Sequence, residues 1–397
     1  MAVRNQSQPS RGGLPTWLMG IIPLLLLALL IVLFFIANPL SFFSGAFPPL
    51  EDLSVQQVLF PEENQIQLSV INGGPDPVTI AQVLVDDAYW QFSIEPASTL
   101  SRLETATIHL NYPWVDGEPL PIVLVTSTGV TFDAEVDVAV LSPQTNFTTF
   151  IVYGLLGIYV GVIPVALGML WYPFMRRVER KWTFAFLALT IGLLIFLFAD
   201  TVLEALEIAE ELPGIFQGVP LILFGILLTL LVLLVVGRRG RGNSPLGLAT
   251  LIAIGIGLHN LGEGLAIGAA FATGLAALGT FLVVGFTLHN ITEGIGIVAP
   301  LMAGERPKLR TFVWLAILAG APAMLGTWIG GFAFNPLLAV IFLSIGAGAI
   351  LQVVWEVGQL LARQSRADGT SAYSWLNLAS LLAGILIMYL TAFLVKF

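Results

Sequence analysis

The sequence contains no cysteine and only three histidines among its 397 residues. Disulfides, thiolate metal sites and cysteine nucleophiles are therefore excluded, and any metal site must use nitrogen and oxygen ligands. Charged residues are scarce as well, at 10%, whereas 57% of the residues are hydrophobic. So few polar side chains cannot cover the surface of a soluble globule of this length. The composition predicts a protein embedded in a lipid bilayer.

Nine apolar stretches are long enough to cross the hydrocarbon core of a bilayer, which takes about 20 helical residues. Because these runs are continuous and do not alternate with polar residues, they indicate helices and not the strands of a barrel. We therefore expect an all-α helical bundle in the membrane. The nine predicted spans are residues 17–37, 147–172, 182–203, 214–237, 246–273, 275–301, 309–333, 337–361 and 374–395.

Basic residues favour one side of this bundle. Lys and Arg concentrate in the short cytoplasmic loops of membrane proteins, and 14 of the 16 here fall in alternate connections. Only Arg102 and Lys396 fall on the other side. The predicted topology is a multi-pass protein of the cell membrane with a cytoplasmic N-terminus and an extracytoplasmic C-terminus. The 14 residues are Arg4, Arg11, Arg176, Arg177, Arg180, Lys181, Arg238, Arg239, Arg241, Arg306, Lys308, Arg310, Arg363 and Arg366.

The first apolar run has two interpretations. A charged segment precedes it and the small residues Ser44, Gly45 and Ala46 follow it, as in a secretory signal. Its length of about 20 residues exceeds the roughly 7 to 15 of a signal core, which favours a retained anchor. In either case the segment that follows is exported.

Residues 47–143 differ in residue pattern from the rest of the chain. Short β-branched runs at 65–71, 78–85 and 122–126 are separated by turn-forming residues, and about seven such strands predict a small all-β sandwich. Residues 50–142 hold 14 acidic residues and one basic residue, which argues against nucleic acid binding and suits a cation-rich outer compartment. The expected domains are 1–46, a tail and anchor, 47–143, the sandwich, and 144–397, the eight-helix membrane domain.

The fifth and sixth predicted spans carry the same polar motif, His-Asn-x-x-Glu-Gly. At about 100° per residue, positions three and four apart share one helix face, so each motif forms a polar stripe. A carboxylate at mid-membrane costs about 2.5 to 3.5 kcal/mol, so such residues face partners or water. Consecutive antiparallel spans would bring both stripes to one point. The polar residues are His259, Asn260, Glu263, His289, Asn290 and Glu293.

A metal site and interhelical packing are the two explanations for these stripes. Polar groups bonded to one another would fix the helix packing without any ligand. We favour a metal site because two of only three histidines occupy equivalent positions. Neutral imidazole and ionised carboxylate together suit Zn(II), Fe(II), Mn(II), Co(II) or Ni(II). The third histidine, His109, falls in the sandwich region and is expected on its surface.

The motif pair resembles that of the ZIP (Zrt/Irt-like) metal transporters of the bacterial type, whose fourth and fifth core helices carry His-Asn-x-x-Asp/Glu-Gly and related motifs. The resemblance covers residues 147–397, with the first span and the β-domain as additions. It implies eight core helices and an elevator-like movement of four of them. It also implies a primary metal site, with two asparagines lining the adjoining one. The implied primary ligands are His259, Glu263, His289 and Glu293, and the asparagines are Asn260 and Asn290.

Two departures from the family pattern bear on the site. Gly262 and Thr292 stand where many members have Pro, so a proline kink is not expected there. Some members carry a Glu on the sixth core helix that helps to form a second metal site, whereas residues 319–331 contain no acid. A single-metal site is therefore favoured over a two-metal one.

Two further sets of residues are candidates for the ion pathway. Gln352 and Glu356 lie four residues apart and resemble a polar pair on the family's seventh core helix, so Glu356 is expected either to relay metal or protons or to cap the helix. The other set forms an acidic edge on the third span, read either as a cation entrance or as a solvated helix end. It consists of Asp200, Glu204, Glu207, Glu210 and Glu211.

The predicted function is transport of a divalent metal toward the cytoplasm, with the metal as substrate and no cofactor. Zinc is the first candidate, followed by iron, manganese, cobalt, nickel and cadmium. The rivals are an intramembrane metal-dependent hydrolase and a metal-sensing receptor. The hydrolase lacks a clear nucleophile and the His-Glu-x-x-His pattern of zinc peptidases, so an enzyme is not expected. Lipid is the expected surrounding partner, nucleic acid is not, and a homodimer or a partner of the β-domain stays open.

Overall fold

The computed structural model describes residues 16–37, 48–136, 138–210, 212–237, 244–273 and 276–393. The chain divides into two compact units, Met1–Leu50 and Glu51–Phe397. Several residues used in the sequence analysis lie outside the described residues. They are Arg4, Arg11, Ser44, Gly45, Ala46, Glu211, Arg238, Arg239, Arg241 and Lys396.

The first unit contains a single described helix, α1 (Thr16–Ala37), over the first predicted span. The side chains of its apolar segment Ile21–Ala37 are exposed along their whole length. That segment is shorter than any of the helices of the second unit that are long enough to span a bilayer. An apolar helix with its side chains exposed in this way is suited to contact with lipid, so the anchor stays a prediction.

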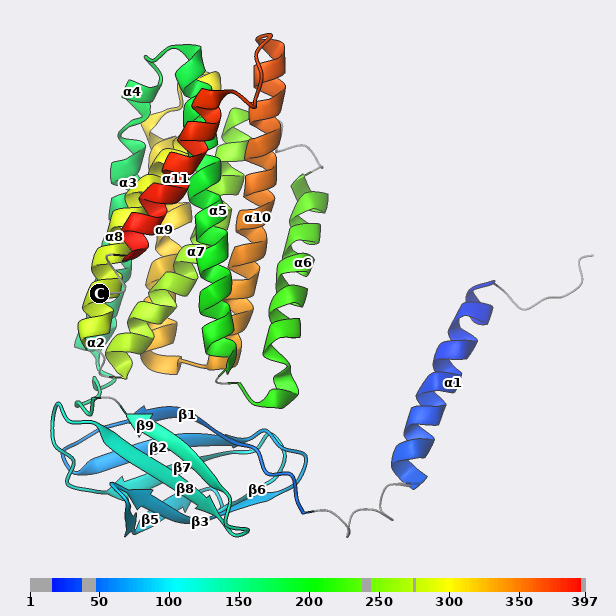
Figure 1. Ribbon diagram of the computed structural model, residues 1–397, viewed down its shortest axis with the longest axis vertical. Coiled ribbons are helices and arrows are strands. Elements are labelled where there is room, and N and C mark those ends of the chain that lie inside the picture. Colours follow the sequence, from blue (N-terminus) through cyan, green and yellow to red (C-terminus); the bar gives the residue numbers. More distant parts are fainter. Residues whose placement is uncertain are drawn as a thin grey trace, which may run out of the picture. The chain divides into compact units, whose positions relative to one another are not determined.

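The β-region forms two antiparallel sheets with nine strands, two more than the approximate number predicted. One sheet has the order β1-β2-β7-β5, and the other has the order β4-β3-β8-β9 with β6 paired to β3 (Figure 1). The strands are β1 (Leu53–Leu59), β2 (Gln65–Asn72), β3 (Val78–Val85), β4 (Ala88–Trp90), β5 (Phe92–Glu95), β6 (Thr99–Leu100), β7 (Thr105–Asn111), β8 (Leu120–Thr126) and β9 (Thr131–Val136).

The two sheets share one hydrophobic core, as expected of a sandwich. Alternate residues of each sheet, such as Leu68 and Ile108 on one and Ile122 and Leu124 on the other, are fully buried in a common cluster. The prediction missed the short strands because two or three residues cannot show a period of two. Asp86 and the residue after it have positive φ angles of 51° and 62°, so an Asp-Asp pair makes the turn from β3 to β4.

Within the described residues, eight helices are long and apolar enough to cross a membrane, and they cover the eight later predicted spans. The span Phe147–Met175 is composite, because a π-helical turn interrupts its α-helix. The segments are α2 (Phe147–Gly157), η2 (Ile158–Val162), α3 (Ile163–Met169), α4 (Tyr172–Met175), α5 (Arg180–Glu210), η3 (Gly214–Phe216), α6 (Gly218–Gly237), α7 (Pro245–Ala272), α8 (Ala276–Val298), η4 (Ala299–Ala303), α9 (Leu309–Ala333), α10 (Pro336–Ala367) and α11 (Trp375–Phe393).

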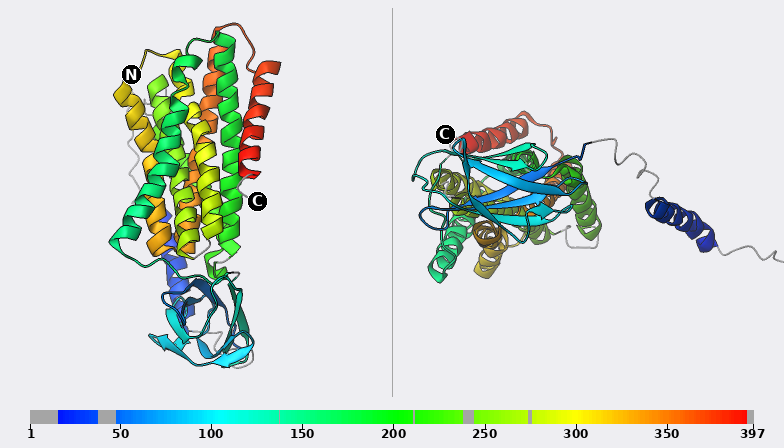
Figure 2. Two further views of the ribbon diagram at one scale, coloured as in Figure 1. Left: turned by 90° about the vertical axis from the view of Figure 1, so that its left-hand side faces the viewer. Right: turned by 90° about the horizontal axis from the view of Figure 1, so that it is seen from below.

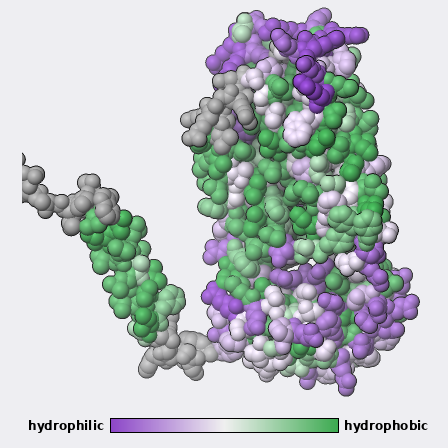
Figure 3. All heavy atoms as spheres, turned by 180° about the vertical axis from the view of Figure 1, so that it is seen from behind, coloured by the Kyte–Doolittle hydropathy of each residue, from purple (hydrophilic) through white to green (hydrophobic). Residues whose placement is uncertain are grey.

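The eight spans run side by side as a bundle (Figures 1 and 2). Hydrophobic side chains cover the flank of this bundle, and hydrophilic ones gather at its end (Figure 3). Leu227, Leu231, Trp314 and Leu386 are among the exposed hydrophobic residues of the bundle helices. The shortest span, with 19 residues, is about 28 Å long at 1.5 Å per residue and so matches the bilayer core. A multi-pass membrane protein follows from these features.

Two helices extend further than predicted. Helix α10 continues to Ala367, so Arg363 and Arg366, which were expected in a loop, lie on its last turns. Helix α5 begins at Arg180 and continues to Glu210, so most of the predicted acidic edge is helical. Hydropathy alone placed the C-terminal ends of both helices too early. Charged residues can continue a helix beyond the hydrocarbon region without interrupting its hydrogen bonds.

Candidate metal centre

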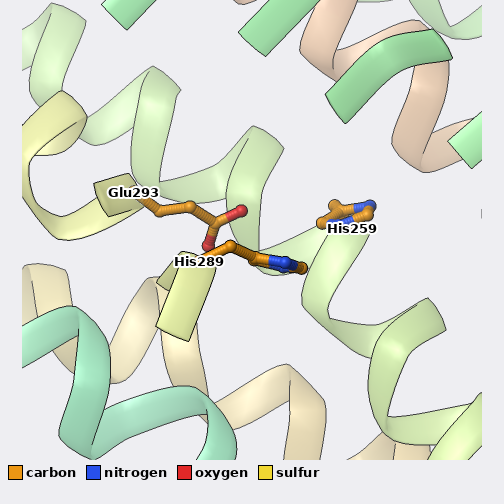
Figure 4. A group of neighbouring side chains, drawn as sticks. All are labelled: His259, His289 and Glu293. Atoms are coloured by element: carbon orange, nitrogen blue, oxygen red, sulfur yellow. The ribbon is translucent and has the colours of Figure 1, made fainter. Parts of the chain in front are cut away.

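The two motifs lie on neighbouring helices, and all six of their polar side chains are buried. Helix α7 carries the first motif and α8 the second. Each of these six residues is at most 4% exposed, and both asparagines are completely buried. Three residues bring ligand atoms within 4.8 Å of one another, namely His259, His289 and Glu293. Figure 4 shows His289 and Glu293 reaching from one helix toward His259 on the other.

Glu263 lies at the centre of the hydrogen-bonding contacts. Its Oε1 atom lies 3.1 Å from Nε2 of His259 and also contacts Nε2 of His289. Its Oε2 atom accepts a hydrogen bond of 3.0 Å from Nδ2 of Asn290. An ionised carboxylate can only accept hydrogen bonds, so each imidazole contact needs a proton on Nε2. A cation that binds the Nε2 lone pairs would replace those protons.

Glu293 has a different environment from Glu263, although the motifs are alike. Both of its carboxylate oxygens are buried and have no hydrogen-bond partner among the described residues. The carbonyl oxygens of the two motif asparagines, Asn260 and Asn290, are also buried without a partner there. A buried acceptor without a donor is costly, and a buried charge costs more. Four such acceptor atoms beside two imidazoles are the environment that a divalent cation would stabilise.

The asparagines are held by their amide nitrogens. Nδ2 of Asn260 donates to the carbonyl oxygen of Ala319 on α9, and Nδ2 of Asn290 donates to that of Val160 on η2, each over 3.0 Å. Because each NH₂ group is fixed in this way, the other end of the amide is left to offer its oxygen. The asparagines therefore hold the helix packing through their nitrogens, and each keeps an oxygen that could bind a metal.

The glycine after each glutamate permits close approach of a neighbouring backbone. A Cβ atom on Gly264 would meet the carbonyl oxygen of Ala323 on α9, and one on Gly294 would meet that of Val165 on α3. On α9, the residues that meet Asn260 and Gly264 are Ala319 and Ala323, which are four positions apart. Around η2, the residues that meet Asn290 and Gly294 are Val160 and Val165, which are five positions apart. The extra residue is the one that a π-helical turn inserts, and such turns are frequent at functional sites.

No known protein family and no curated protein matches this chain. The assignment of the site therefore depends on its own residues and on their geometry.

The acidic edge of α5 lies beside the metal centre. Asp200, Glu204 and Glu207 line a cavity whose lining also includes His289. Of the other acidic residues predicted there, Glu210 is exposed at the end of α5. A cavity with several carboxylates in its wall attracts cations by its electrostatic field.

The remaining candidates lie away from the motif cluster. Gln352 is buried on α10, and its Nε2 lies 3.5 Å from Oε1 of Glu356, which makes a weak hydrogen bond at most. Glu356 does not belong to the group of candidate ligands formed by His259, His289 and Glu293. His109 lies on β7 with its side chain exposed, as the prediction of a surface residue requires.

Sequence reasoning missed Thr201, a buried residue of α5 whose Oγ1 lies 2.9 Å from Nδ1 of His259. Its position between two acidic residues of the same span, Asp200 and Glu204, was the available signal. A threonine in an apolar helix commonly bonds its own backbone, so this signal was too weak to single out Thr201.

Proposed function

We propose that this chain is a membrane transporter that moves a divalent transition-metal cation toward the cytoplasm through the His/Glu/Asn centre of α7 and α8. The observation that carries the proposal is the set of buried acceptor oxygens of Glu293, Asn260 and Asn290, which have no partner among the described residues and lie with two imidazoles. Zinc suits these ligands best, and iron, manganese, cobalt, nickel and cadmium are further candidates.

The centre offers the metal a choice of ligands around one point. Nε2 of each histidine and an oxygen of Glu293 would form the first set, with the asparagine oxygens beside them. The metal loses water when it enters, and anionic carboxylates offset the cost of burying its double charge. Because Glu263 already contacts both histidines, it can take the released protons or turn toward the metal.

Entry from the outer compartment is the route that the charges favour. The carboxylates of Asp200, Glu204 and Glu207 would concentrate cations in the cavity that His289 lines. The basic residues of the described connections, including Arg176, support a cytoplasmic location for those connections under the positive-inside rule. Uptake toward the cytoplasm follows from these two arguments.

The test is metal uptake by purified protein in liposomes, with an ion-sensitive dye inside. Glu293→Gln and His289→Ala should abolish saturable uptake because each removes a candidate ligand. The matched control is His109→Ala, which removes the one histidine outside the centre, on an exposed position of β7. Its uptake should equal that of the unchanged protein.

Three other results would redirect the proposal. Unimpaired uptake by both ligand variants would end it. Saturable metal binding with no flux would favour the receptor. Turnover of lipid or peptide that disappears with a chelator would favour the hydrolase.

A further inference from the structure

We infer that Thr201 is a positioning residue of the metal centre, which holds a proton on Nδ1 of His259 and thereby reserves Nε2 for the metal. This inference rests on the proposed function of the same site. Thr201 is completely buried on α5, 58 residues from His259 in the sequence, and belongs to neither motif. Through its hydroxyl group, α5 contacts the imidazole of the first motif.

The direction of this hydrogen bond follows from the single proton of the hydroxyl group. Oγ1 of Thr201 lies 2.7 Å from the carbonyl oxygen of Leu197, one turn earlier on α5, and 2.9 Å from Nδ1 of His259. A carbonyl oxygen cannot donate, so the hydroxyl proton serves the shorter contact with Leu197. The lone pair of Oγ1 then faces Nδ1, and the imidazole must donate.

A proton on Nδ1 decides which nitrogen can bind a metal. Each neutral imidazole has one N–H and one lone pair, so a protonated Nδ1 leaves the lone pair on Nε2. Nε2 is the atom that faces Glu263, at 3.1 Å, and thus points toward the other side chains of the centre. The proton that Nε2 shares with Glu263 is the one that a metal replaces, whereas Nδ1 keeps its own proton for Thr201. Without Thr201, the contact with Glu263 alone holds the single proton of the neutral ring on Nε2, and the lone pair lies on Nδ1.

The bond also fixes the orientation of the ring. Two contacts at opposite nitrogens, with Thr201 and with Glu263, prevent rotation of the imidazole about its Cβ–Cγ bond. Partners of this kind typically contribute about 10- to 100-fold to metal affinity. Because Thr201 comes from α5 and not from the motif helices, movement of α5 relative to α7 would release the ring.

The experiment compares Thr201→Val, which keeps the shape but removes the acceptor, with Thr201→Ser, which keeps the acceptor. We expect Thr201→Val to weaken Zn²⁺ or Co²⁺ binding about 10- to 100-fold and Thr201→Ser to recover most of the affinity. Thermal unfolding of both variants in detergent monitors folding. Affinity of Thr201→Val equal to that of the unchanged protein, with the fold intact, would overturn the inference.

A second measurement detects the imidazole proton of His259 directly and needs no metal. In ¹⁵N-histidine spectra only three imidazoles contribute, and the variants His109→Ala and His289→Ala assign them. Nδ1 of His259 should carry a proton in the unchanged protein and in Thr201→Ser, whereas in Thr201→Val the single proton of the neutral ring should lie on Nε2. Absence of a proton from Nδ1 in the unchanged protein would overturn the inference. Absence of metal binding by a protein with the expected tautomer would instead refute the proposed function alone.

Discussion

Nδ2 of Asn290 donates a 3.0 Å hydrogen bond to the backbone carbonyl of Val160, 130 residues earlier in the chain. Asn260 makes the equivalent bond with Ala319. Both motifs are therefore fixed to a neighbouring helix beside their ligand atoms. The candidate metal centre and the packing of α7 and α8 share these side chains.

Replacement of Asn290 by Asp tests this double role. Asn290→Asp keeps the oxygen but removes the NH₂ donor, so the carbonyl of Val160 and Oε2 of Glu263 lose a donor and face another acceptor. We expect a loss of about 1–3 kcal/mol in stability together with loss of metal uptake. Thermal unfolding in detergent measures the first effect. Asn146→Asp is the matched control, because Asn146 caps the exposed start of α2 and Asp caps equally well.

Glu263 and Glu293 should respond differently to the same substitution. Glu293→Gln replaces a buried carboxyl group whose oxygens have no hydrogen-bond partner among the described residues, so the melting temperature should hold or rise while metal affinity falls. Glu263→Gln disrupts contacts with His259, His289 and Asn290, so both quantities should fall. Calorimetry of unfolding measures the melting temperature, and calorimetry of Zn²⁺ binding measures the metal affinity. Equal behaviour of the two variants would contradict the unequal environments.

Replacement of Gly264 by Ala tests the close approach of α7 to α9. Its new Cβ would collide with the carbonyl oxygen of Ala323, so we expect a loss of about 1–3 kcal/mol from overpacking. Gly358→Ala is the control, because a Cβ there meets open space in the middle of α10. That control should be neutral or stabilising by up to about 1 kcal/mol, since Ala has the higher helix propensity. A Gly264→Ala protein as stable as the control would refute the predicted contact.

Neutral variants of the acidic residues test the entrance. Combined substitution Asp200→Asn, Glu204→Gln and Glu207→Gln should slow uptake at low ionic strength and have less effect in high salt, because salt screens the attraction. The control is Glu62→Gln with Glu63→Gln, two exposed residues of the β-region. Uptake rates measured between low and high salt decide the question. A salt-independent loss would mean that these residues serve the metal centre directly.

The absence of cysteine makes the predicted orientation directly testable, because any introduced cysteine is the sole thiol. Arg102→Cys, in the exposed segment before β7, should react with an impermeant maleimide added to intact cells. Arg306→Cys, in the exposed connection before α9, should react only after the membrane is permeabilised. The reverse pattern would invert the topology and with it the expected direction of transport.

The sequence by itself determined the features that depend on local pattern. Continuous apolar runs predicted the spans, and the helical period placed His259 and Glu263 on one stripe of α7, because both properties depend on neighbours within a few residues. Alternation likewise located long strands such as β3, whereas β6, with two residues, was too short to be recognised.

Only the tertiary structure decided how the matching motifs differ. It connected Glu263 to both histidines while it left Glu293 without a hydrogen-bond partner among the described residues, and it brought Thr201 to the imidazole of His259. These contacts join residues that are 26 or more positions apart, except for the pair within α7. Such contacts depend on how the helices pack against one another, and helical periodicity, which repeats every 3.6 residues, contains no information about which neighbour lies opposite.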